Sequence, residues 1–404
     1  MTIPYCTAPF HSFTVEPDKS VRPCTAWVDD PLGNLQTQNL NDILNSTQLK
    51  NLQQQMIQQT PPAGCSDCIH REENFGHSAR TDICKPFIPY LNHNKITYIE
   101  FNGSNLCNLV CAMCEPAYSS AWYEFRKDIP WWREFRELNG WKNEERTHSM
   151  LVYRPSWDLH PPQVDFTKSF LDTVDFSMVN RLMLKGGEPM LNKENILLLE
   201  HLDKLKVLSN ITILMITNGT YISDKLLELM KKAGKIVLVL SIDGLEKINQ
   251  YIRYDPKNHE VSHTDNIKQN IFKYLESDNI LIRIDPAVQA YNIHSLEKLR
   301  QWWYKDIYSN NTTKIAPYDY FKHFVRSPKE LSISVLDETT RQTLANYYES
   351  IDSKCYRLVI DELRLPRVSK DIHQKFVKYT EALDRTRPDK FLDLVPEARD
   401  IMNY

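Results

Sequence analysis

The stretch ITYIEFNGSNLCNLVCAMC, residues 96–114, decides the fold, because a short apolar run in it leads directly into three closely spaced cysteines. The run ITYIEF (96–101) is rich in β-branched and aromatic residues and predicts a buried strand. Cys107, Cys111 and Cys114 follow in a C-x3-C-x2-C array. Proteins built from βα units keep their active sites in the loops after the strands. The stretch therefore predicts a reactive site after the first strand of such a fold.

Three thiolates within eight residues can bind one face of a metal cluster. A structural zinc site needs four ligands, and no fourth Cys or His follows within the next thirty residues. On a four-iron cluster, three thiolates leave one iron open to a substrate or cofactor, which is a reactive arrangement. Buried or zinc-bound cysteines remain the alternative interpretation.

Further along the chain, short apolar runs alternate with segments of helical period. The runs predict buried parallel strands, with a sixth strand around 318–325. Repeated βα units imply either a doubly wound sheet or a barrel. The other strands are expected at RLMLKG (181–186), ITILMITNG (211–219), KIVLVLSIDG (235–244) and ILIRIDPAVQ (280–289), and the helices around 192–208, 223–233, 245–252 and 264–277.

A second motif, LKGGEP (184–189), contains the chain's one Gly-Gly pair, Gly186 and Gly187. Glycines at the carboxyl end of a strand let the backbone approach a ligand closely. Glu188 offers a carboxylate that can accept hydrogen bonds from a cationic amino group. Taken alone, the motif is also compatible with an ordinary turn.

Over about residues 95–330, the cysteine array, the Gly-Gly-Glu-Pro motif and the later strands resemble the radical S-adenosylmethionine (SAM) enzymes. The resemblance implies a partial (β/α)6 TIM-like barrel. It also implies a [4Fe-4S] cluster whose open iron is chelated by SAM, reductive cleavage of SAM, and a 5'-deoxyadenosyl radical that abstracts hydrogen from a substrate. Gly186, Gly187 and Glu188 would then hold the methionyl amine. Met113 stands where the family usually has an aromatic residue beside the adenine.

Two further strands end on polar residues, in ITNG (216–219) and SIDG (241–244). Such residues commonly satisfy only the backbone of a turn. The resemblance implies instead that Ser241 contacts the ribose and that Arg253 approaches the carboxylate of SAM. Asn218 and Asp243 are expected at or just behind the cofactor.

The first 94 residues hold a second set of cysteines: Cys6, Cys24, Cys65 and Cys68. Four such ligands suit zinc or an iron-sulfur cluster, and their spacing alone does not choose. The segment resembles the SPASM and twitch modules of radical SAM enzymes, which favours an auxiliary iron-sulfur cluster. Two differences are its place before the barrel and Lys19, which stands where the motif has glycine. A left-handed backbone at Lys19 would carry strain of about 1 kcal/mol.

We therefore expect three parts: an auxiliary-cluster module (1–94), a barrel (95–330) and a helical C-terminal extension (331–404). The tryptophan-rich insert 119–179 is expected to cap a substrate site, although its aromatic residues could equally pack it onto the barrel. Cys84 and Cys355 are most simply buried thiols, with Cys84 joining the auxiliary cluster, or either one returning a hydrogen atom to a substrate radical, as alternatives.

The composition disfavours some classes of binding partner. Lys plus Arg number 49 against 52 for Asp plus Glu, a net charge of -3, which disfavours nucleic acid as the main partner. No apolar run is long enough for a membrane helix, and we expect a cytoplasmic protein. The resemblance implies a one-electron donor such as flavodoxin or ferredoxin, and the SPASM-like module favours a peptide substrate. Oxidation or rearrangement of a sugar or nucleotide, and a zinc-binding scaffold with a decayed barrel, are the alternatives.

Overall fold

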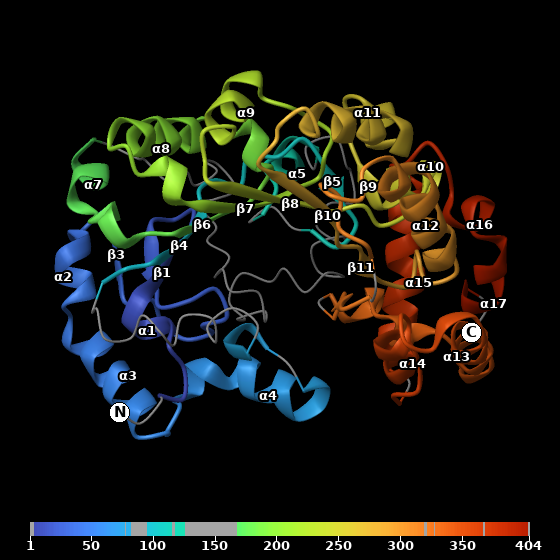
Figure 1. Cartoon of the computed structure of the whole chain (residues 1–404). Helices are drawn as coiled ribbons and strands as arrows, with labels where there is room; N and C mark the ends of the chain where they lie inside the picture. The colour runs from blue at the N-terminus through green and yellow to red at the C-terminus, as the bar shows by residue number, and fades with distance from the viewer. Residues whose placement is uncertain are drawn as a thin grey trace.

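The computed structural model describes residues 4–76, 78–81, 95–114, 118–125, 168–318, 321–326, 328–366 and 368–402. A sheet runs through the centre, with helices on its outer face (Figure 1). The N-terminal module lies against one end of this sheet, and the C-terminal helices lie at the other end. In the described part of the chain, no helix is both long and apolar enough to cross a membrane.

Five parallel strands form the barrel part of the sheet, and each coincides with one of the apolar runs expected from the sequence. In space they follow their order in the chain. One helix follows β6, one follows β7 and two follow β8, each placed as the helical periodicity predicts. The strands are β4 (Tyr98–Asn102), β6 (Arg181–Lys185), β7 (Thr212–Thr217), β8 (Lys235–Leu240) and β10 (Ile280–Ile284), and the helices α8 (Lys193–Lys204), α9 (Asp224–Met230), α10 (Glu246–Ile252) and α11 (Thr264–Tyr274). The expected parallel sheet of a partial barrel is confirmed.

The N-terminal module does not stand apart from this sheet but extends it. Strand β1 (Ser12–Val15) pairs in parallel with β4, from Ser12 opposite Tyr98 to Val15 opposite Phe101. Two antiparallel strands, β2 (Ser20–Arg22) and β3 (Gly33–Asn34), continue the sheet beyond β1. The module's helices are α1 (Ala8–His11), α2 (Leu40–Leu44), α3 (Thr47–Ile57) and α4 (Ser66–Phe75).

The N-terminal module and the barrel therefore share one apolar core. Phe13 and Val15 of β1 are fully buried in the same apolar cluster as Ile99 and Phe101 of β4. The turn before β2 contains Lys19 at φ 65°, the left-handed conformation considered in the sequence analysis. Its N–H donates to the Glu16 carbonyl oxygen at 2.8 Å, which closes the turn.

The sixth strand is present only as short pieces. Ile315 forms a single parallel bridge with Ile282 of β10. The next residue but one is Pro317, which has no N–H to continue the ladder. Pairing resumes where β12 (His323–Phe324) lies parallel to β11 (Ala287–Val288).

The chain after β11 is mostly helical, and from residue 331 on it forms the helical extension expected from the sequence. These helices pack beside α10 and close one end of the molecule (Figure 1). They are α12 (Leu296–Trp302), α13 (Glu338–Asp352), α14 (Arg357–Leu363), α15 (Lys370–Asp384), α16 (Phe391–Leu394) and α17 (Arg399–Met402).

Candidate active site

The first cysteine set lies on the loop that follows β4. A two-residue strand in this loop, β5 (Val110–Cys111), pairs antiparallel with β9 (Arg253–Tyr254), the segment just after α10. The Cys114 N–H donates to the carbonyl oxygen of Cys111 at 3.0 Å, and the Leu109 N–H points to Cys107 Sγ at 3.5 Å. Cys111 is buried and the other two cysteines are half-buried. The loop thus presents three thiols from one short, hydrogen-bonded turn, which fits the three-thiolate ligand set of a cluster.

Arg253 is held beside these thiols by Asp243. Its Nε lies 2.8 Å from Asp243 Oδ2, and its Nη1 lies 3.9 Å from Cys111 Sγ. Burial alone would lower the pKa of Arg253, but the Asp243 carboxylate and Cys111 outweigh it and hold the pKa above its ordinary value. The site therefore contains a permanent cation next to a thiol that must be a thiolate in order to bind metal.

Two glycines bring the second motif against the cysteine loop. At Gly186, with φ 88°, a Cβ atom would lie 1.6 Å from Asn102 Oδ1. At Gly187, with φ 49°, it would lie 2.3 Å from the carbonyl oxygen of Leu106, the residue before Cys107. The Glu188 N–H donates to that same oxygen at 2.7 Å. Only glycine permits this close approach of the two backbones.

Glu188 lies fully buried behind the turn and joins the turn to the end of β7. Its Oε1 accepts from the Met190 N–H at 3.0 Å and from the Thr217 hydroxyl at 2.7 Å, and its Oε2 accepts from the Asn218 N–H at 2.7 Å. Burial raises the pKa of Glu188 to about 6 in spite of these hydrogen bonds. A carboxylate has about four acceptor positions, so one further donor, such as an ammonium group, can still be accommodated.

The other polar strand ends lie around the same loop. The Asn218 amide donates to Asn108 Oδ1 at 3.1 Å, which ties the end of β7 to the cysteine loop. Asp243 Oδ1 accepts from the Ala287 N–H at 2.8 Å. Ser241, directly after β8, is half-buried, and its N–H donates to the Thr217 carbonyl oxygen at 2.9 Å. Met113 is partly buried against the core.

Two residues of the C-terminal extension also hold the cysteine loop. They are not among the site residues expected from the sequence. The Tyr379 hydroxyl of α15 donates to the carbonyl oxygen of Ala112. Arg387 Nη2 donates to the Val110 carbonyl oxygen at 2.9 Å, and its guanidinium carbon lies 4.6 Å from the centre of the Tyr254 ring. Both residues are buried. They lie more than 260 residues from the loop and carry no local sequence signal.

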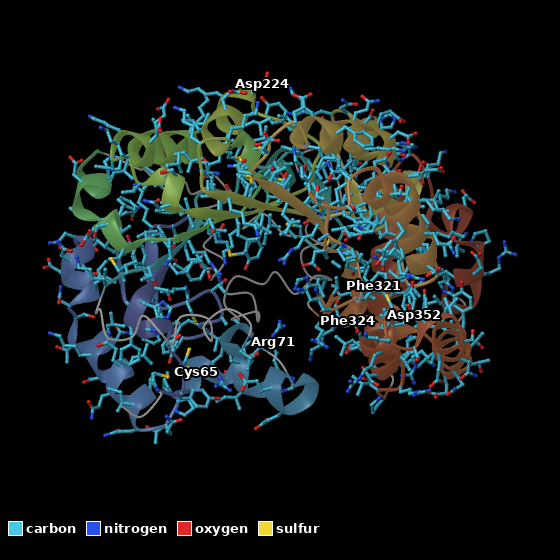
Figure 2. The ribbon with its side chains drawn as sticks, viewed as in Figure 1. Cys65, Arg71, Asp224, Phe321, Phe324 and Asp352 are labelled. Carbon is cyan, nitrogen blue, oxygen red and sulfur yellow. The ribbon has the colours of Figure 1, made fainter. Side chains whose placement is uncertain are left out.

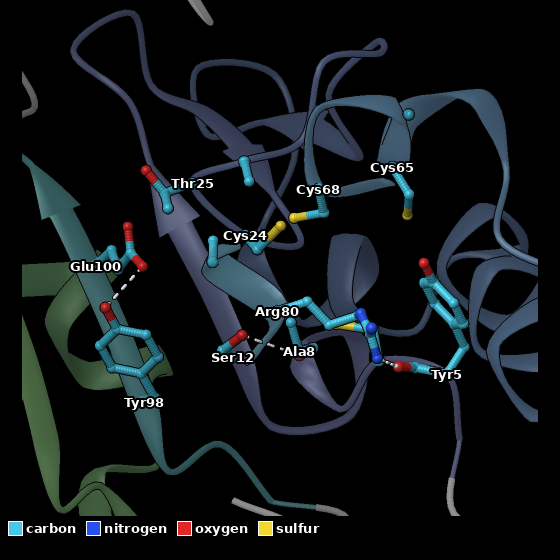
Figure 3. A pocket seen from close by; sticks show the side chains of 14 residues that line it. Tyr5, Ala8, Ser12, Cys24, Thr25, Cys65, Cys68, Arg80, Tyr98 and Glu100 are labelled. Atoms are coloured by element: carbon cyan, nitrogen blue, oxygen red, sulfur yellow. Dashed lines mark hydrogen bonds between the residues drawn. The ribbon is translucent and has the colours of Figure 1, made fainter. Parts of the chain in front are cut away.

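The second cysteine set lines one cavity in the N-terminal module (Figure 3). Cys24 follows β2, Cys65 immediately precedes α4, and Cys68 lies in the first turn of that helix. Cys6 contributes the fourth thiol. Burial raises the pKa of Cys65 to about 12 and holds that of Cys24 well above its ordinary value. Four thiols that gather in a largely apolar cavity fit a cluster that would keep them deprotonated.

A short segment after α4 contacts this cavity. Burial raises the pKa of Cys68, and hydrogen bonds from the Arg80 backbone and the Ser78 hydroxyl partly offset the rise. The Arg80 side chain is clamped by Glu72, with Nε to Oε1 at 2.8 Å, and donates to the Tyr5 carbonyl oxygen at 3.0 Å. Figure 3 shows the guanidinium among the residues that line the cavity.

A buried polar chain connects the cavity with the barrel sheet. Lys185, the last residue of β6, forms an ion pair with Glu100 of β4 at 2.9 Å and also contacts the Thr25 hydroxyl. Glu100 in turn accepts from the Tyr98 hydroxyl at 2.7 Å. Thr25, Tyr98 and Glu100 all line the cavity. Lys185, which directly precedes the Gly-Gly turn, thus contacts Thr25, the residue next to Cys24.

One candidate residue is not brought to either site, and others lie outside the described residues. Cys355 is buried within the apolar core. Cys84 and residues 126–167, the greater part of the insert expected to act as a cap, lie outside the described residues. Trp122, at the near end of that insert, is fully buried and packs on the core. Among the residues that the structure describes, no three Cys, His, Asp or Glu side chains gather tightly enough to hold a single metal ion.

Two family models match the chain. Residues 101–278 match the radical SAM superfamily, and residues 6–69 match SPASM, described as an iron-sulfur cluster-binding domain. Together they contain all seven cysteines of the two sets. The order of the matches places the SPASM module before the barrel, as the sequence predicted. No curated protein matches the chain.

Solved structures resemble the chain only distantly. Native anSMEcpe with bound AdoMet and Cp18Cys peptide is 17% identical, with a TM-score of 0.37, and the match covers 68% of this chain and 62% of that one. SuiB of Streptococcus suis bound to precursor peptide SuiA is 15% identical, with a TM-score of 0.34, over 83% of this chain and 67% of that one. The chain thus spans less than two thirds of the length of anSMEcpe.

Proposed function

We infer the function of this chain from the family to which it belongs, the radical SAM superfamily of enzymes, with a [4Fe-4S] cluster and SAM as cofactors and a SPASM module for an auxiliary iron-sulfur cluster. From this premise we propose that it cleaves SAM reductively and uses the resulting 5'-deoxyadenosyl radical to abstract hydrogen from a peptide. Cys107, Cys111 and Cys114 would hold the catalytic cluster. Cys6, Cys24, Cys65 and Cys68 would hold the auxiliary cluster.

The observation that carries this proposal is the close packing of the Gly-Gly turn on the cysteine loop. The Glu188 N–H donates to the Leu106 carbonyl oxygen at 2.7 Å, directly before the first cysteine of the array. This contact brings the carboxyl ends of β4 and β6 together. A ligand seated on the turn would therefore lie beside the thiols, as a cofactor that chelates a cluster iron must.

Different residues of the chain would bind different groups of the cofactor. Glu188, with one acceptor position left, would receive the methionyl ammonium group. Arg253, a permanent cation beside Cys111, would attract the carboxylate of the same amino acid moiety. Ser241 and Asn218, at the ends of the next two strands, would contact the ribose or order the loop around it. Asp243 keeps the Arg253 guanidinium in place.

A peptide substrate is supported by the SPASM module, since such modules are common in peptide-modifying radical SAM enzymes. With four cysteines in its cavity, the module can ligate a cluster without help from a substrate. This leaves the auxiliary cluster free to exchange electrons rather than bind the peptide. The bond formed or oxidised in the peptide depends on the substrate.

The test is the variant in which Cys107, Cys111 and Cys114 are all replaced by alanine. It should make no 5'-deoxyadenosine from SAM and dithionite, because alanine cannot ligate iron. It should keep about half of the wild-type iron, since the auxiliary set is untouched. The matched control replaces Cys6, Cys24, Cys65 and Cys68 and should keep the other half. Undiminished 5'-deoxyadenosine from the first variant would overturn the assignment.

Metal analysis of the anaerobically purified protein separates this proposal from a zinc-binding scaffold. The enzyme should contain about four to eight irons per chain. One or two zinc ions with no iron would instead support the scaffold.

A further inference from the structure

A cavity of about 270 Å³ lies apart from both cysteine sets, between the N-terminal module and the C-terminal helices. Arg71 of α4 lines it on one side, and Arg357 of α14 lines it on the other. Residues on and next to β12, Lys322, Phe324 and Arg326, complete the lining. A single water needs only about 10 to 15 Å³, so the cavity has room for a ligand segment. Figure 2 labels Arg71 and Phe324, which face this space from opposite parts of the chain.

The charge of the lining is positive although the chain as a whole carries -3. Four cations line the cavity, Arg71, Lys322, Arg326 and Arg357, against two carboxylates, Asp361 and Glu362, which leaves an excess of two positive charges. A local excess of cations in an acidic protein favours an anionic ligand.

Two of the four cations have weak partners within the protein. Arg357 lies 3.9 Å from Asp361, and both side chains are more than half exposed. Arg71 pairs at 3.0 Å with Asp67, which does not line the cavity. Exposed pairs of this kind contribute only about 0 to 1 kcal/mol. A ligand carboxylate can therefore take the place of the protein carboxylate at little cost.

Phe324 gives the cavity an apolar face beside these charges. The guanidinium carbon of Arg326 lies 5.5 Å from the centre of the Phe324 ring, while Glu362 holds the same guanidinium at 2.7 Å. A cation fixed over a ring offers both a charge and a flat surface. This combination suits a chain that alternates carboxylates with less polar groups.

The cavity is connected to the candidate active site through the strand pair β11–β12. His323 stands between Lys322 and Phe324 in the chain. Its Nδ1 lies 2.7 Å from Oδ1 of Asp285, the residue directly after β10. Successive side chains of a strand point to opposite faces, so β12 turns His323 to the barrel and its neighbours to the cavity. The Ala287 N–H of β11 donates to Asp243, the partner of Arg253.

We propose that this cavity anchors an acidic segment of the peptide substrate, through carboxylates that meet Lys322 and Arg357. The anchored peptide then passes over β12 toward the cysteine loop. The proposal rests on the peptide function proposed above and adds a substrate class to it.

The experiment measures binding without turnover. The reconstituted, unreduced holoenzyme is mixed with a fluorescein-labelled octapeptide of alternating Glu and Ser, and separately with its counterpart in which Gln replaces Glu. Lys322→Gln combined with Arg357→Gln removes two of the cations. Lys204→Gln combined with Lys235→Gln, at exposed positions outside the cavity lining, removes the same charge and serves as the control.

The unaltered protein should bind the Glu peptide about tenfold more tightly than the Gln peptide. The double variant at the cavity should reduce that preference to about threefold or less, and the control pair should keep it. Equal binding of the two peptides, or an undiminished preference in the cavity variant, would overturn the proposal. Displacement of the Glu peptide by inorganic phosphate at equal concentration would overturn it in favour of a general anion site.

Failure of this proposal can be told apart from failure of the proposed function. Cleavage of SAM without substrate needs only the cysteine loop and the cofactor residues, so the cavity variant should form 5'-deoxyadenosine at the wild-type rate. If the unaltered protein cleaves SAM but binds the Glu and Gln peptides equally well, only the proposed anchoring cavity is overturned. Absence of cleavage in the unaltered protein overturns the function.

Discussion

Arg387 Nη2 and the carbonyl oxygen of Val110 are 2.9 Å apart, although 277 residues separate them in the chain. Through this bond and the Tyr251 carbonyl oxygen, which Arg387 Nε reaches at 3.2 Å, the C-terminal extension holds the cysteine loop from behind. Arg387→Gln should destabilise the protein by about 1 to 3 kcal/mol, because buried carbonyl groups lose a charged donor. Thermal unfolding and iron content measure the effect. The exposed Arg385→Gln is the control and should change neither.

Gly187→Ala should be far more damaging than Gly76→Ala, although both glycines have positive φ. At Gly187 the added Cβ meets the Leu106 carbonyl oxygen at 2.3 Å, whereas at Gly76 nothing lies within 4 Å. We expect a loss of more than about 2 kcal/mol at the first position and about 1 kcal/mol at the second. The first variant should also bind SAM poorly, as calorimetry can show. Equal stability of the two variants would contradict the close packing of the two motifs.

Glu188→Gln should weaken SAM binding by about tenfold, because a carboxylate bonds an ammonium group about twice as strongly as a neutral acceptor does. The substitution also places an amide N–H₂ among three donors, those of Met190, Thr217 and Asn218. Calorimetry on the reconstituted protein gives the affinity, and iron analysis shows whether the cluster is kept. An unchanged affinity for SAM would show that Glu188 has only a structural role.

The auxiliary cluster should have a lower midpoint potential in Arg80→Gln. The guanidinium lines the cysteine cavity and is fixed there by Glu72, so it favours the more negative, reduced form of a cluster. Loss of one nearby charge should lower the potential by about 50 mV, as a charge several ångströms away in a protein predicts. Potentiometry followed by electron paramagnetic resonance measures the shift. Arg71→Gln, on the preceding helix but outside this cavity, should leave the potential unchanged.

Acid should destabilise the N-terminal module through His11. This side chain is 1% exposed, and its burial lowers the pKa to about 4 from 6.5. The unfolded chain therefore takes up a proton at a higher pH than the folded one, and stability is lost as the pH falls from 6.5 toward 4. Between pH 7 and pH 5 the loss from this group should be about 2 kcal/mol. Unfolding curves of His11→Gln should lack that part of the pH dependence.

The sequence predicted the barrel strands well because their signal is local. Runs such as KIVLVL are apolar on both faces, and only a buried parallel strand or a buried helix has that pattern. The first cysteine set was equally visible, since its three members follow one another closely, whereas the more widely spaced second set was identified from its resemblance to the SPASM and twitch modules. The glycine pair indicated a close approach to a ligand, and the close approach that the structure shows is to a group of the chain itself, the Leu106 carbonyl oxygen.

Contacts between distant segments carried no such signal. Nothing near Ser12 indicates that its strand will pair in parallel with Tyr98, because parallel pairing depends on the whole sheet. Nothing near Arg387 points to Val110. The sixth strand was expected as one piece, but Pro317 removes the donor that would have joined its two parts.

The pairing of β1 with β4 also fixes the spacing of the two cysteine sets. Cys24 follows the strand that pairs with β1, and Cys107 follows β4, so a hydrogen-bonded ladder sets the separation of the two sets. A flexible linker would let that separation vary, and with it the tunnelling rate between any clusters bound there. If both sets hold clusters as proposed, the distance over which an electron passes between them would be a fixed property of the sheet.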